Sequence, residues 1–113
     1  MKEIIEKIKA FRNERNWEIF HTPENLAKSI AIESAELLEH FQWDGVEVNK
    51  SGVEEELADV LIYCFLLADH YDFDITDIME RKIKKNAQKY PVKEAYGNAK
   101  KYTELRKDKN HGN

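Results

Sequence analysis

Leu57-Ala58-Asp59-Val60-Leu61-Ile62-Tyr63-Cys64-Phe65-Leu66-Leu67-Ala68 carries one charged residue, Asp59, among twelve. A stretch this apolar predicts a helix that is buried on nearly every side, and the carboxylate goes inside with it. An isolated buried carboxylate costs several kcal/mol or takes up a proton, so it requires a cation. Asp59 therefore predicts a binding site rather than a solvated surface charge.

Two pairs of acidic residues share one spacing. Glu56 precedes Asp59 by three residues, and Glu33 and Glu36 repeat that interval upstream. Residues three apart lie on one side of a helix, so two such pairs on antiparallel neighbours can face each other. Ligands that offer only oxygen favour Mg²⁺ or Mn²⁺. A solvated helix face explains Glu36 taken alone, but it fails for Asp59, whose neighbours are apolar.

The chain predicts an all-α fold of four helices within one domain, residues 1–107, followed by a disordered tail, residues 108–113. Thr22 and Asp74 are expected to cap the second and fourth helices, and Pro91 is expected to end the fourth. The remaining basic segment is expected to run extended over the surface. The four expected helices cover about residues 2–16, 22–43, 53–71 and 74–90.

The expected second helix directs Leu26, Ile30, Leu37, Leu38 and Phe41 toward the core. Glu54 to Glu56 are placed against the N-terminal dipole of the third helix. That helix is too apolar all round for a lone four-helix monomer, so we expect at least a homodimer.

Charge and composition exclude several classes of protein. The formal charge is −4, and residues 91–113 hold six Lys/Arg against three Asp/Glu, so the acidic excess lies in residues 1–90. An acidic body argues against duplex nucleic acid as the partner. The apolar run of about 12 residues is short of the ~20 that a membrane span requires. With no signal peptide recognised, a cytoplasmic location is expected. Cys64, the single cysteine, predicts a reduced buried thiol.

Other residues allow both a structural and a functional reading. Lys82 and Asn86 interrupt the apolar stripe of the fourth helix, and Lys85 flanks it. They either pack at a helix surface or hold phosphate oxygens or a base edge. Trp17 and Trp43 either pack at helix ends or stack on a nucleobase. His21 is either a surface residue or a donor to a base.

Several segments in order resemble the MazG-like all-α nucleoside triphosphate pyrophosphohydrolases, and most closely their dCTP pyrophosphatase branch. The resemblance covers about residues 10–105, and its paired acidic motifs define the superfamily. Ile32 departs from the pattern, because many members carry a glutamate before the one that matches Glu33. The segments are Phe20-His21-Thr22-Pro23-Glu24-Asn25-Leu26, Glu33-Ser34-Ala35-Glu36-Leu37, Phe41-Gln42-Trp43, Glu55 to Tyr63, Asn86 to Pro91 and Lys101-Tyr102-Thr103.

This resemblance implies hydrolysis of a nucleoside triphosphate between its α- and β-phosphates, in the sanitation of nucleotide pools. It implies Mg²⁺ as the cofactor, with Mn²⁺ as a substitute, and a homodimer or homotetramer with helices shared across the interface. Either Glu33 or Glu36 is expected to orient the attacking water. The implied metal ligands are Glu33, Glu36, Glu56 and Asp59; the implied nucleoside pocket is Trp17, His21, Trp43 and Tyr63, with phosphate or base contacts from Lys82, Lys85 and Asn86.

Three alternatives stay open on the sequence. One is the same chemistry with broad specificity for noncanonical triphosphates. Another is a di-iron carboxylate bundle, which normally uses Glu-x-x-His pairs, whereas here Glu36 and Asp59 occupy the histidine positions. The third is a non-catalytic helical scaffold.

Overall fold

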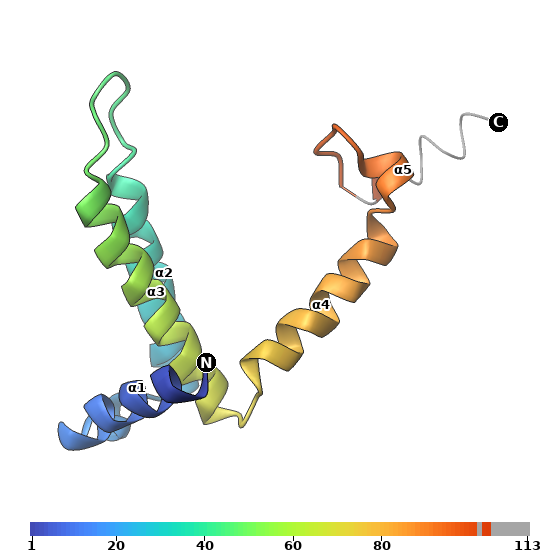
Figure 1. Ribbon diagram of the computed structural model, residues 1–113. Helices are drawn as coiled ribbons and strands as arrows, with labels where there is room; N and C mark the ends of the chain where they lie inside the picture. The colour runs from blue at the N-terminus through green and yellow to red at the C-terminus, as the bar shows by residue number, and fades with distance from the viewer. Residues whose placement is uncertain (102, 105–113) are drawn as a thin grey trace. The chain divides into compact units, whose positions relative to one another are not determined.

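The computed structural model describes residues 1–101, 103 and 104, and these residues form helices, turns and loops without any strand. The predicted all-α fold with four long helices is confirmed. Residues 1–73 and the residues from Asp74 onward form two compact units (Figure 1). The helices are α1 Lys2–Glu14, the 3₁₀ helix η1 Trp17–Phe20, α2 Pro23–Glu39, α3 Lys50–His70, α4 Ile75–Lys89 and α5 Val92–Ala95.

Helix α2 begins where the sequence predicts and ends earlier. The Thr22 hydroxyl accepts a hydrogen bond from the backbone N–H of Asn25 at 3.2 Å, and Pro23 occupies the first helical position. The predicted end at Trp43 is wrong, because the helix ends at Glu39. The chain then turns toward Gly45, whose φ of +75° suits glycine.

Helix α3 begins three residues before the predicted Val53. The Asn49 side chain caps it by accepting the backbone N–H of Gly52 at 3.1 Å, a cap that the sequence analysis did not identify. The first turn therefore holds no acidic residue. The prediction that Glu54 to Glu56 interact with the N-terminal dipole is wrong. These residues lie one turn beyond the start of α3, and the dipole effect is confined to the first turn.

The first unit is built on the antiparallel hairpin of α2 and α3, with α1 crossing the end of that pair (Figure 1). Its buried core is small: Ile8 from α1, Leu26 from α2 and Leu66 from α3, with Tyr63 and Phe65 partly buried against them. Asp69 near the end of α3 accepts a hydrogen bond from Arg12 Nη1 at 3.1 Å. This ion pair joins α1 to α3.

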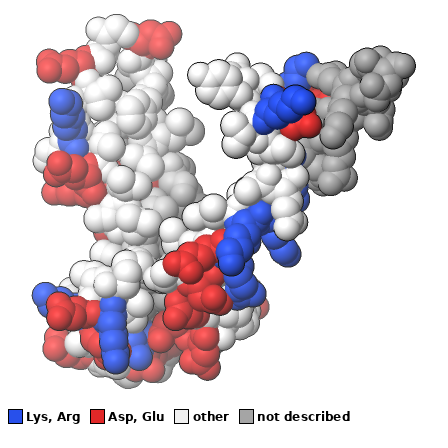
Figure 2. Space-filling model, turned by 45° about the vertical axis from the view of Figure 1, so that its right-hand side comes forward, with Lys and Arg blue, Asp and Glu red and all other residues white. Residues whose placement is uncertain are grey.

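Much of the predicted core is exposed in the single chain. Leu38 is 69% exposed and Leu61 is 49% exposed, and Figure 2 shows a largely uncharged surface over the α2–α3 pair on the face in view. Asp59 is also exposed, so its predicted burial on nearly every side is wrong for one chain. The reason is that α1 and α2 pack against only part of the circumference of α3, so its remaining side chains face solvent.

The second unit contains α4 and the short helix α5. Asp74 caps α4 by accepting the backbone N–H of Asp77 at 3.0 Å, and α4 ends at Lys89, two residues before Pro91, as predicted. The extended conformation predicted after Pro91 is wrong for Val92–Ala95, which form α5. The tail predicted for residues 108–113 lies outside the described residues. None of the described helices meets the length and apolarity needed to cross a membrane.

Candidate functional site

Carboxylates from α2 and α3 converge on the facing sides of the hairpin. Glu33, Glu56 and Asp59 each place one oxygen within 4.8 Å of the others, and we refer to these three residues as the carboxylate cluster. Glu36 lies beside the cluster, close enough for its charge to act on Glu33 and Glu56. The structure thus brings the two acidic pairs of the sequence together.

Among the residues that the structure describes, no lysine or arginine forms an ion pair with the cluster. Burial raises the pKa of Glu33 to about 7, and the neighbouring Glu36, Asp59 and Glu56 carboxylates add to this shift. Burial, followed by the neighbouring Glu36, also raises the pKa of Glu56. Glu33 Oε2 is buried and finds no hydrogen-bond partner among the described residues. A ring of oxygen donors with an unsatisfied buried atom fits a hard cation, so the cluster can bind a metal ion.

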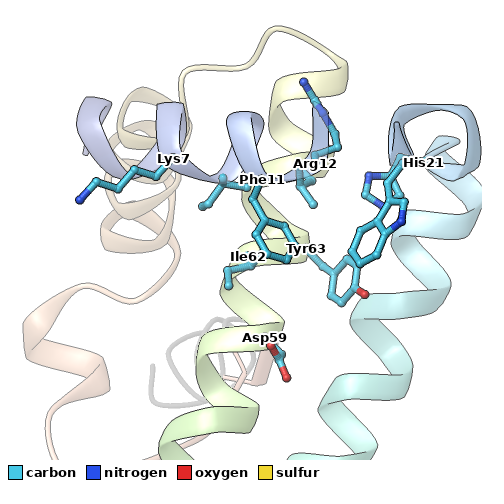
Figure 3. Close-up of a pocket in the computed structure, with 10 residues that line it drawn as sticks. Lys7, Phe11, Arg12, His21, Asp59, Ile62 and Tyr63 are labelled. Carbon is cyan, nitrogen blue, oxygen red and sulfur yellow. The ribbon is translucent and has the colours of Figure 1, made fainter. Parts of the chain in front are cut away.

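A pocket of about 420 Å³ adjoins the cluster. Figure 3 shows Asp59 on α3 at one end of this pocket, with Ile62, Tyr63 and Phe11 nearer to α1. Asp59 therefore belongs both to the cluster and to the pocket wall. The lining residues are Lys7, Ile8, Phe11, Arg12, Trp17, His21, Asp59, Ile62, Tyr63 and Leu66.

The aromatic wall comes from α1, from η1 with its C-terminal cap, and from α3. Asn16, with a left-handed φ of 54°, separates α1 from η1 and turns the chain toward Trp17. The Trp17 ring meets Phe11 edge to face at 5.7 Å between centroids, and the His21 ring meets Tyr63 at 6.5 Å. Three of the four predicted nucleoside-pocket residues, Trp17, His21 and Tyr63, therefore line one cavity.

His21 presents a neutral imidazole to this pocket. Burial lowers its pKa, and the positive charge of Arg12 lowers it further, while Glu18 acts in the opposite direction. Its Nδ1 atom is buried and has no hydrogen-bond partner in the described part of the chain. A neutral imidazole offers one donor and one acceptor, which suits the edge of a base. A second cavity of about 410 Å³ shares His21, Arg12 and Leu66 with the first.

The remaining predicted residues lie elsewhere. Trp43 is in the loop after α2, is 70% exposed and does not line the pocket. Lys82, Lys85 and Asn86 are exposed on α4, in the second unit. Their roles stay predictions.

Sequence reasoning missed Arg12 as a pocket residue. Its side chain is 13% exposed and is paired with Asp69. The available signal was its position one helical turn after Ile8, at the edge of the apolar stripe of α1. Its partner Asp69 is 57 residues away in the sequence, so no local spacing indicates the pair.

The fold and the site define an all-α protein with a carboxylate cluster that can bind a metal ion, beside an aromatic pocket. The MazG-like family matches residues 28–105 of the chain. A solved structure of a pyrophosphatase from Archaeoglobus fulgidus is 44% identical, with a TM-score of 0.75 over 80% of this chain and 92% of that one. The chain belongs to the MazG-like family.

Curated relatives carry a more specific name. dCTP pyrophosphatase 1 of Mus musculus is 39% identical over 104 residues, which cover 84% of this chain. The Homo sapiens protein of the same name is 38% identical over the same share. The chain spans 61% of the length of these relatives.

Proposed function

We propose that this chain is a nucleoside triphosphate pyrophosphohydrolase that cleaves a dCTP-like nucleotide between its α- and β-phosphates. The observation that carries the proposal is the double position of Asp59, in the carboxylate cluster and in the wall of the aromatic pocket. A base in the pocket would leave its phosphates near the cluster. The similarity to dCTP pyrophosphatase 1 and to an archaeal pyrophosphatase supports the same reaction. The cellular role of this chain would be the sanitation of nucleotide pools.

We assign Mg²⁺ to Glu33, Glu56 and Asp59, with Mn²⁺ as a substitute. A triphosphate and a carboxylate cluster repel each other, so they require a shared cation. When bound, such an ion neutralises phosphate oxygens and lowers the pKa of a coordinated water. Glu36 lies beside the three ligands but outside the set whose oxygens meet within 4.8 Å. We propose that its carboxylate orients the attacking water and accepts its proton.

These positions support an in-line hydrolysis. Water oxygen forms a bond to the α-phosphorus, the bond from that phosphorus to the bridging oxygen breaks, and pyrophosphate leaves opposite the attack. Trp17 and Tyr63 would hold the base by ring contacts, and neutral His21 would pair with its edge. The pocket volume of about 420 Å³ falls within the usual range for small-molecule sites. Lys82, Lys85 and Asn86 stay predicted contacts to phosphate or base.

Product analysis tests the reaction directly. The chain is incubated with Mg²⁺ and dCTP, dUTP, dATP or a 5-modified dCTP, and the products are separated by chromatography. A monophosphate and pyrophosphate are expected, while a diphosphate and orthophosphate would contradict the proposal. Similar rates across the panel would favour a broad-specificity enzyme for noncanonical triphosphates. Bound iron with redox activity and no pyrophosphate would favour a di-iron protein instead.

We also propose that the chain forms a homodimer or homotetramer. Leu38 on α2 and Leu61 on α3 are about half exposed or more in one chain, and Figure 2 shows a largely uncharged surface over the α2–α3 pair. A second copy that covered these side chains would remove apolar area from water. Light scattering during size-exclusion chromatography tests this, and a monomer at micromolar concentration would contradict it.

A further inference from the structure

His40 lies where the end of α2 meets the start of α3. It is the C-terminal capping residue of α2, and its imidazole packs against Gly52 in the first turn of α3. A Cβ atom added at Gly52 would overlap the ring at Cε1 and would lie 3.0 Å from Nε2. Because the ring would have to move, glycine at this position creates the space that His40 occupies.

From this space the imidazole faces a member of the carboxylate cluster. Nε2 of His40 lies 4.0 Å from Oε1 of Glu56, and both side chains are 22% exposed. Glu56 follows Gly52 by four residues, so the glycine and the carboxylate lie on one side of α3. Among the described residues, no lysine or arginine forms an ion pair with Glu33, Glu56 or Asp59.

We propose that His40 is a positioning residue for Glu56, and that Gly52 supplies the space this role requires. The Nε2–H would donate to one oxygen of Glu56, which directs the other oxygen toward the cluster. Both a neutral imidazole protonated at Nε2 and an imidazolium can be this donor. The role rests on the proposed function, because it concerns Glu56 as a metal ligand. It adds a residue that the acidic motifs do not contain.

The expected effect follows from how such partners act in metal sites. A carboxylate that turns freely must be ordered when the ion binds, whereas a carboxylate held by a donor is already oriented. Losing a partner of this kind typically weakens metal binding about 10- to 100-fold. The distance of 4.0 Å is longer than a hydrogen bond, so a small rotation of either side chain is part of the proposal.

The first test measures Mn²⁺ binding to the nucleotide-free chain by titration calorimetry. Replacing His40→Leu fills the same space without a donor, and we expect Mn²⁺ affinity to fall about tenfold. Replacing His40→Gln keeps an N–H donor and should restore most of that affinity. Glu55→Gln, at an exposed position outside the cluster, is the matched control and should bind as the unmodified chain does. Unchanged affinity in His40→Leu, or equal losses in His40→Leu and His40→Gln, would overturn the role.

A double-mutant cycle tests the space at Gly52. Gly52→Ala should weaken Mn²⁺ binding when His40 is present and should have little effect in a chain that carries His40→Ala. Equal losses in both backgrounds would show that the alanine acts through its other neighbour, Asn49, and would overturn the proposal. If circular dichroism shows that His40→Leu does not fold, this cycle tests the positioning role of His40 in its place.

Glu56→Gln separates this inference from the proposed function. If Glu56→Gln abolishes Mn²⁺ binding and His40→Leu does not weaken it, the metal site stands and the positioning role is wrong. If Glu56→Gln binds Mn²⁺ as tightly as the unmodified chain, both the metal site and the positioning role are wrong.

Discussion

The middle of α3 and its C-terminal end hold their carboxylates in opposite ways. Asp69 lies 3.1 Å from Arg12 Nη1 and 3.6 Å from Lys9 Nζ, so its charge is compensated by α1. Asp59, ten residues earlier and about 15 Å away along the helix, lies instead among Glu33 and Glu56. Asp69 holds α1 against α3 through ion pairs, whereas Asp59 belongs to a cluster that can bind a cation.

This contrast separates stability from function along one helix. The raised pKa values of Glu33 and Glu56 mean that the folded chain resists ionisation at the cluster. Such repulsion lowers stability, and it is typical of sites kept for binding rather than for folding. The ion pair of Asp69 has no comparable conflict. Four experiments use this difference, in order of decreasing effect.

The largest effect is expected from Asp59→Asn. The change keeps the shape of the side chain and removes a charged ligand, so kcat/KM for dCTP should fall roughly 100-fold or more, since a metal ion supplies several kcal/mol of charge stabilisation. The free energy of unfolding should stay the same or rise, because repulsion within the cluster is relieved. Turnover and urea unfolding are measured together. Retained turnover would favour the non-catalytic scaffold.

A smaller effect is expected from Trp17→Ala in the aromatic pocket. Loss of one base-stacking ring costs about 1–3 kcal/mol, so KM for dCTP should rise about tenfold with kcat less affected. Trp43→Ala is the matched comparison, because Trp43 lies outside this pocket in one chain. A larger effect on base preference from Trp43 than from Trp17 would locate the base elsewhere.

A stability effect of about 1 kcal/mol is expected from Asp69→Asn. Arg12 is 13% exposed, and the change leaves its guanidinium without a carboxylate partner. Urea unfolding measures the loss. The control is Asp77→Asn, which removes an exposed pair with Arg81 on α4 and should change the free energy of unfolding by less than about 0.5 kcal/mol. Equal losses in the two variants would mean that the attachment of α1 does not depend on Asp69.

The smallest effect is a pH dependence of stability in the presence of a chelator. The pKa of Glu33 is raised from 4.5 to about 7, so the folded chain binds a proton that the unfolded chain releases. The contribution of this proton to the free energy of unfolding is fully present below pH 4.5 and is lost as the pH rises through 7. The midpoint temperature of unfolding of the unmodified chain should therefore fall more with rising pH than that of Glu33→Gln. Parallel pH profiles of the two chains would contradict the raised pKa.

Much of the site was predictable because its residues follow local rules. Thr22 and Asp74 cap helices through contacts three residues away, and the acidic pairs lie three residues apart on single helices. The resemblance to the MazG-like family, and not a local rule, implied that Trp17, His21 and Tyr63 share a pocket, and they line one cavity. Arg12 and His40 were missed because their partners, Asp69 and Glu56, come from a distant part of the chain.

The sequence by itself determined the helical class, the caps at Thr22 and Asp74 and the three-residue spacing within each acidic pair, because periodicity and capping act within a few residues. Only the tertiary structure decided which charges are compensated and which are not. It also decided that Asp59 is exposed in one chain and that Gly52 leaves space for His40. Burial and pairing depend on the helix that packs alongside, and no local pattern specifies that neighbour.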